Sequence, residues 1–234
     1  MSTEEIRGEN ENYEELYEGD YYTPEKGKIN INLARLTVIC GLIGIITSFI
    51  PNQYYLTIIL GILTAIFQTM VVLQWKSILS NNVENTLKFI KIMYGKYPEN
   101  EKDIDSVRGS IRMINFSLNL YWIYLLLYFL TQVFYFNYFL AYATNFFSVI
   151  FIIIFLRNFF DSQSYLENSK SKFYEKISPG SSLLKCFRRV SLAKIFILLI
   201  ITLGFYWWYI LLTNSHEINR YIDSDENKKV SFLR

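Results

Sequence analysis

The 234-residue sequence is poor in the residues that usually carry chemistry, with one histidine, two cysteines and four prolines. His216 follows the last apolar run, so no intramembrane histidine pair can ligate haem and a b-type cytochrome is excluded. Cys40 lies in an apolar run and Cys186 in a basic stretch, so no disulfide framework is expected. P-loop, CxxC, HExxH and GxSxG motifs are also missing. We therefore expect no enzyme, no metal site and no cofactor.

Charged side chains are missing from the centres of five long apolar runs. A hydrocarbon core about 30 Å thick needs about 20 apolar residues in a helix, and a backbone in lipid must satisfy its own hydrogen bonds. The sequence therefore predicts an all-α, polytopic membrane helical bundle whose solvent is the lipid bilayer. Without intramembrane ionisable groups, a proton-coupled pump is disfavoured. The predicted spans are about 33–50, 54–75, 115–136, 138–156 and 192–212.

The charge is distributed unevenly around these runs. Residues 1–24 carry eight carboxylates against Arg7, so we interpret them as a disordered acidic tail before a transmembrane domain at 25–213. A polar C-terminal tail is expected over 214–234. The long loops 76–112 and 157–191 are basic, whereas the connections at 51–53 and at Asn137 are short and uncharged. The positive-inside rule therefore places the N-terminus and both long loops in the cytoplasm of a multi-pass protein of the cell membrane.

The side of the C-terminus depends on the fifth run. Five full spans would place it outside the cell, although the tail carries four basic residues. If the run instead breaks at Gly204 and turns back, the protein has four spans and a re-entrant segment, and the tail is cytoplasmic. Broken backbone at membrane depth would need protein cover or water.

Both long loops have helical periodicity. Apolar residues recur at helical spacing from Val83 to Tyr94 and from Leu166 to Ile177, which predicts helical cytoplasmic extensions. A second short helix is expected in each loop, around residues 104–111 and 183–187. Short matches at an offset of 83 residues, such as Val83–Thr86 with Leu166–Ser169, also suggest a duplicated hairpin unit, although chance could supply them.

Uncharged polar and small residues mark the predicted spans. The amides Gln68, Asn119, Gln132 and Asn145 favour hydrogen bonding between helices over a substrate site. Gly61, Ala65 and Thr69 form a small-residue face on the second span. We expect this face to meet the first span within one hairpin, with homodimerisation as the alternative.

The last apolar run carries the strongest local motif, Thr202-Leu203-Gly204-Phe205-Tyr206-Trp207-Trp208-Tyr209, followed by Glu217-Ile218-Asn219-Arg220. This pattern resembles a domain-of-unknown-function family of small prokaryotic multispan membrane proteins, marked by T-x-G-[IF]-Y-x-W and a later E-I-N. Phe205 stands where the family usually has Ile. The resemblance covers Thr202 to Arg220 and implies a membrane protein without a known activity or ligand. From the residues themselves, Gly204 suits a hinge or contact notch, Thr202 can bend the helix, and Asn219 is expected at a solvated helix end.

Two functions remain open on these grounds. The leading hypothesis is a non-enzymatic scaffold, sensor or accessory subunit of the cell envelope, with a membrane-protein partner or a second copy of the chain. The alternative is an oligomeric passive pore or facilitator for a small or lipidic solute, lined by the four amides. Asp161 and Glu167 are six residues apart and would lie on different helix faces, which disfavours a lipid enzyme. Nothing in the basic loops indicates a nucleic-acid partner.

Overall fold

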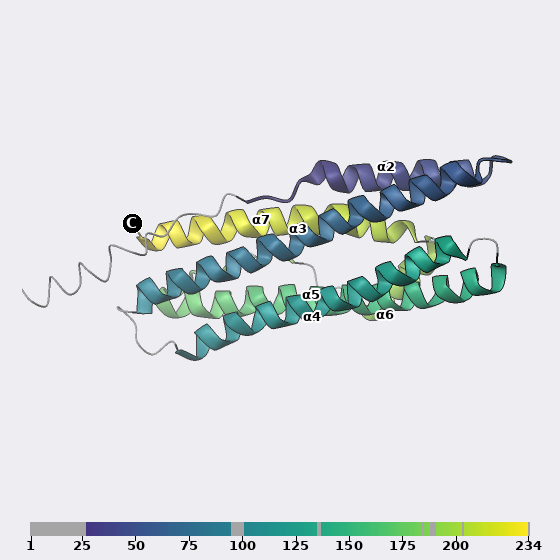
Figure 1. Ribbon diagram of the computed structural model, residues 1–234. Coiled ribbons are helices and arrows are strands. Elements are labelled where there is room, and N and C mark those ends of the chain that lie inside the picture. The colour runs from purple at the N-terminus through teal and green to yellow at the C-terminus, as the bar shows by residue number, and fades with distance from the viewer. Residues whose placement is uncertain are drawn as a thin grey trace, which may run out of the picture.

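The computed structural model describes residues 27–94, 101–134, 137–183, 185–187, 191–202 and 204–233, so the predicted acidic tail at 1–24 lies outside the described residues. The described part of the chain is helical and contains no strand, which confirms the all-α prediction. Figure 1 shows an elongated bundle of long helices. The helices are α2 (Ile31–Ser48), α3 (Tyr54–Tyr94), α4 (Glu101–Val133), α5 (Tyr138–Ile177), α6 (Leu192–Ile201) and α7 (Phe205–Leu233).

Four of these helices, α2, α3, α4 and α5, are long and apolar enough to cross a bilayer. Only 22 to 28% of the residues in their apolar windows are buried inside the bundle. Large apolar side chains therefore face outward, among them Ile46, Leu126 and Phe139, which are 62%, 61% and 79% exposed. A water-soluble fold does not present so much contiguous apolar surface, whereas a lipid-facing bundle requires it. The architecture is that of a helical membrane bundle.

The two short connections join consecutive helices within a few residues, as the sequence predicts. Between α2 and α3, Asn52 adopts a positive φ of 65°, a conformation that asparagine tolerates better than most residues. Between α4 and α5, the side chain of Asn137 accepts a hydrogen bond from the Leu140 backbone N–H and so caps α5. Each turn joins two antiparallel helices into a hairpin.

The predicted cytoplasmic extensions are helical, but they are continuations of the spans. α3 runs unbroken for 41 residues and α5 for 40, and the short helix expected around 104–111 is the first part of α4. The helix expected around 183–187 does not form among the described residues of that segment. There the backbone N–H groups of Leu183, Cys186 and Phe187 donate to the side chains of Ser171 and Glu167 on α5 instead. Side-chain acceptors on α5 therefore replace the internal bonds of a helix.

The fifth predicted span, 192–212, is not a single helix. It is divided into α6, whose ten residues reach only about half-way across a hydrocarbon core, and the first part of α7. The break lies at Thr202 to Gly204, where the alternative reading of the sequence expects it.

Residues 214–233 of the segment predicted as a polar C-terminal tail form the last two thirds of α7, and they are packed into the bundle. Phe232, near the end of α7, contacts Phe89 near the end of α3 and Tyr174 near the end of α5. α7 therefore ends where α3 and α5 end, at the end of the bundle marked C in Figure 1. Some of the charged residues that suggested a solvated tail instead form buried ion pairs.

Candidate functional site: a broken helix with a pocket and a buried ion cluster

Thr202 joins the two halves of the broken helix. Its hydroxyl donates to the backbone oxygen of Leu198 in α6 at 2.6 Å and accepts from the backbone N–H of Tyr206 in α7 at 2.9 Å. One side chain thus closes the last turn of α6 and caps the first turn of α7. The sequence predicts that Thr202 bends the helix, whereas in the structure α6 ends just before this residue and α7 begins just after it.

Gly204 makes the turn itself. Its φ of +92° lies in the region that residues with a Cβ atom rarely adopt, which explains a glycine at this position. Its N–H donates to Leu199 O at 2.8 Å, and its carbonyl accepts from Trp207 N at 3.0 Å. These bonds replace part of the helical ladder, so the turn is compatible with a low-dielectric surrounding.

The turn inserts between the predicted spans, as the contacts of Trp207 show. The buried indole N–H of Trp207 donates to Gln68 Oε1 at 2.9 Å, and Gln68 Nε2 donates to the hydroxyl of Tyr124 at 3.2 Å. Gln68 and Tyr124 lie well inside the predicted spans 54–75 and 115–136. α7 therefore begins deep in the apolar zone of the bundle, held there by hydrogen bonds to α3 and through α3 to α4.

Trp208 packs against the first span. A Cβ atom added to Gly41 of α2 would come within 2.1 Å of the Trp208 ring, so the indole occupies the space that a side chain at 41 would need. Tyr206, another aromatic of the motif, stacks on Tyr209. The aromatic motif therefore fastens the start of α7 to α2, α3 and α4.

The small-residue face of α3 packs against α4, and the prediction that it meets α2 is wrong. Tyr128 donates to the Gly61 carbonyl at 3.3 Å, and the hydroxyls of Tyr121 and Thr69 are 2.9 Å apart. Ala65 is fully buried between these contacts. Three tyrosines of α4 thus form a ladder of hydrogen bonds along α3, which small residues make possible by leaving room for the rings.

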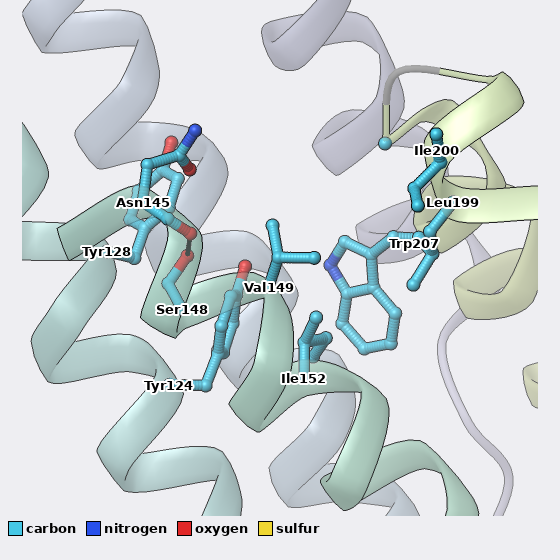
Figure 2. A pocket seen from close by; sticks show the side chains of 10 residues that line it. Tyr124, Tyr128, Asn145, Ser148, Val149, Ile152, Leu199, Ile200 and Trp207 are labelled. Carbon is cyan, nitrogen blue, oxygen red and sulfur yellow. Dashed lines mark hydrogen bonds between the residues drawn. The ribbon is translucent and has the colours of Figure 1, made fainter. Parts of the chain in front are cut away.

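A pocket of about 470 Å³ lies beside the broken helix. Figure 2 shows Trp207, Leu199 and Ile200 at one end and Tyr128, Asn145 and Ser148 at the other, with Val149 and Ile152 between them. The remaining lining comes from Tyr124 and Gly204. The volume falls in the range of pockets that hold small organic ligands.

Among the polar side chains that line this pocket, that of Asn145 is available to hydrogen-bond a ligand. Its side chain is exposed at the bundle surface and has no hydrogen-bond partner among the described residues, whereas Trp207 and Tyr128 donate to other groups of the protein. An amide moved from water into a hydrocarbon without a partner costs about 4 to 8 kcal/mol. Because Asn145 has no hydrogen-bond partner within the described chain, its amide is available to a molecule in the pocket.

A second polar cluster lies at the far end of α7, beyond the predicted spans. Asp225 is completely buried and forms ion pairs with Lys170 of α5 at 2.9 Å and Lys229 at 2.8 Å. It also accepts hydrogen bonds from Asn82 of α3 and Tyr174 of α5, both at 2.8 Å. One carboxylate therefore holds α3, α5 and α7 together.

The environment of Asp225 keeps it ionised. Burial raises the pKa of this carboxyl, but the ammonium groups of Lys170 and Lys229 outweigh burial and hold its pKa well below the ordinary value. Burial lowers the pKa of Lys170 to about 8, against the attraction of Asp225. The Lys229 pKa is also lowered by burial, yet Asp225 and Glu226 together raise it above its usual value. Two cations and two carboxylates balance, as buried charges require.

Asn219, the last motif residue singled out in the sequence, fastens the chain before α2 to α7. Its amide accepts from the Ile29 N–H at 2.8 Å and donates to the Ile29 carbonyl at 3.1 Å. The helix-end role expected for Asn219 is therefore wrong, since α7 continues past it and the side chain binds another segment.

The other candidates from the sequence are not brought together. Gln68 is buried in the Trp207 contact, Gln132 lies beside Gly61, Asn119 is exposed on α4, and only Asn145 lines the pocket. Asp161 pairs with Arg157 across 3.7 Å on the surface, while Glu167 binds backbone N–H groups. Among the described residues, no three His, Cys, Asp or Glu side chains are grouped to hold a metal ion.

The ion cluster could not be recognised from the sequence, because Lys170 is 55 residues away from Asp225 and all three charges resemble ordinary solvated ones. A partial signal was the four-residue spacing of Asp225 and Lys229 on one helix face.

Comparisons of the chain with protein-family models, with curated proteins and with solved structures give no match. The family resemblance of Thr202 to Arg220 therefore stays a prediction.

Proposed function

We propose that this chain is a non-enzymatic sensor or accessory subunit of the cell membrane, in which α7 connects the membrane interior to the cytoplasmic end of the bundle. In this proposal α6 and α7 form a re-entrant hairpin, so the N-terminus, the basic loops and the end of α7 share the cytoplasmic side. The basic residues beyond the spans support this orientation through the positive-inside rule.

One observation carries the proposal: a single helix links the pocket with the ion cluster. Trp207 lines the pocket and Asp225 holds the cluster, about 27 Å apart along α7 at 1.5 Å per residue. Between them, Asn219 binds the segment before α2, and the exposed ion pair of Lys28 with Asp223 adds a further contact there. A molecule that moves the start of α7 therefore acts on contacts at the cytoplasmic end.

The experiment is partner capture combined with a flux assay. The full chain, tagged and cross-linked in the membranes where it is made, should bring down a reproducible membrane-protein partner or a second copy of itself. Liposomes that contain the purified protein should retain small solutes. Trp207→Phe, which removes the indole bond to Gln68, should weaken capture, whereas Trp122→Phe, at a 44% exposed position, should not. Failure to capture any partner, together with solute leakage, would contradict the proposal.

A passive facilitator is the second candidate, and buried amides favour it. Gln163 of α5 and Asn214 of α7 are completely or almost completely buried, and their amide groups have no partner among the described residues. Both lie within about one turn of a residue that contacts Trp75 of α3, namely Phe159 on α5 and Ser215 on α7. Such groups could hold water, which a polar path through the bundle requires. This function predicts liposome flux that Asn145→Leu abolishes without loss of folding, and it requires an oligomer.

A further inference from the structure

The pocket beside the broken helix opens toward the lipid. Two of its lining residues, Asn145 on α5 and Ile200 on α6, are exposed on the outer surface of the bundle, and Ile200 is 53% exposed. At this depth the surrounding medium is hydrocarbon, so the route into the pocket runs from the bilayer between α5 and α6. A ligand that uses this route must itself dissolve in lipid.

The lining selects against charge. None of the described residues around the pocket is Asp, Glu, Lys, Arg or His. A charged headgroup would therefore lose its hydration without gaining a counter-ion, which is unfavourable in a low-dielectric site. The ligand is accordingly a neutral molecule.

The lining favours a flat ring with a hydrogen-bond acceptor. Tyr124, Tyr128 and Trp207 supply aromatic surfaces against which a planar ring packs well, and Val149 and Ile152 supply apolar contact between the two ends. Asn145 is free to donate through Nδ2, and a carbonyl oxygen in the ligand is the complementary group. A plain acyl chain would leave this amide without a partner.

We propose that the pocket binds a neutral, lipid-dissolved molecule with a planar carbonyl-bearing ring, the chemistry of a quinone head, whose carbonyl accepts a hydrogen bond from Asn145. The proposal rests on the sensor function above and names its ligand class. The apolar tail of such a molecule extends between α5 and α6 into the bilayer, and its ring lies next to Trp207 at the start of α7.

The test is equilibrium binding to the full chain in nanodiscs. The probe is a radiolabelled 1,4-benzoquinone with a decyl tail, and decylbenzene, which has no carbonyl, is the comparison compound. Wild-type protein should bind the quinone saturably and decylbenzene more weakly. Asn145→Leu should weaken quinone binding about tenfold, the loss expected for one hydrogen bond, and Val149→Phe should abolish it by filling the pocket. Asn158→Leu is the matched control, because this amide of α5 binds its own backbone at Ile154 and does not line the pocket.

The outcomes separate the ligand from the function. Non-saturable binding, equal affinity for decylbenzene, or unchanged affinity in either Asn145→Leu or Val149→Phe would overturn the ligand assignment. If no saturable binding occurs while partner capture succeeds, the sensor or accessory function stands and the ligand assignment is wrong. If the quinone binds as described but no partner is captured and liposomes leak, the ligand assignment stands and the proposed function is wrong.

Discussion

Replacing Asp225 by Asn tests the buried ion cluster most severely. The change preserves shape but leaves Lys170 and Lys229 buried with only Glu226 as a counter-charge. Removing one partner of a buried ion pair costs about 3 to 5 kcal/mol, because the remaining charge keeps its desolvation cost. For a chain of this size each kcal/mol corresponds to roughly 2 to 4 °C, so Asp225→Asn should lower the melting temperature by roughly 6 to 20 °C.

The chain offers a matched control two residues away. Asp223 forms an ion pair with Lys28 at 2.9 Å, but both side chains are about half exposed. An exposed pair contributes about 0 to 1 kcal/mol, so Asp223→Asn should lower the melting temperature by no more than about 4 °C. Both proteins would be melted in the same detergent, with circular dichroism as the signal.

A double variant separates charge balance from lost packing. Adding Lys170→Met to Asp225→Asn removes one buried cation and leaves Lys229 beside Glu226 at 2.7 Å. The double variant should therefore be more stable than Asp225→Asn alone, which is a coupling that independent sites do not show. Equal melting temperatures for Asp225→Asn and Asp223→Asn, or additive losses in the double variant, would refute the electrostatic reasoning.

Three further predictions follow from the described contacts. First, the pKa of Asp225 is lower in the folded protein than its ordinary value of 3.8, so its ionised form stabilises the fold fully above pH 3.8 and this stability is lost as the pH falls below that value. Melting temperatures at pH 7, 5 and 3 should therefore show that the difference between wild type and Asp225→Asn shrinks only at pH 3. Second, Gly41→Ala should destabilise the protein by about 1 to 3 kcal/mol because the new Cβ meets the Trp208 ring, whereas Gly44→Ala, whose Cβ would lie 3.4 Å from Leu60, should be neutral or stabilising in the same melting assay. Third, Thr202→Val should lower the free energy of unfolding by about 1 to 3 kcal/mol, because it removes the two hydrogen bonds through which this side chain joins α6 and α7. Thr213→Val, which affects hydrogen bonds within α7 alone, should lower it less. Equal losses would contradict the joining role of Thr202.

The membrane class, the hairpin turns and the helical extensions could be predicted because each follows from local pattern. Apolar run length identifies a span, and helical spacing from Val83 to Tyr94 identifies the extension of α3. The motif at Thr202 to Arg220 was also visible, since its run of five aromatic residues directly after a glycine stands out in the sequence. The sequence thus showed where the unusual geometry lies.

Partners of these residues could not be predicted, because they are distant in the chain. Nothing local to Trp208 indicates that its ring occupies the space above Gly41, and nothing local to Asn219 indicates Ile29. The polar residues after Leu212 matched a solvated tail in composition, and only the positions of Lys170 and Tyr174 on α5 turn Asp225 into a buried group. In each case the role of the residue depends on partners that are brought near it only by the tertiary fold.

The central claim is that α6 and α7 form a re-entrant hairpin, so that α7 ends on the same side of the membrane as the extension of α3. Its most direct test is labelling of single cysteines by a membrane-impermeant maleimide in intact cells and in inverted vesicles, after Cys40 and Cys186 are changed to Ala. Ser231→Cys on α7, Ser77→Cys on α3 and Gln53→Cys in the first hairpin turn are exposed positions suited to this purpose. The account predicts that Ser231→Cys and Ser77→Cys label from one side and Gln53→Cys from the other. Labelling of Ser231→Cys from the same side as Gln53→Cys would contradict it.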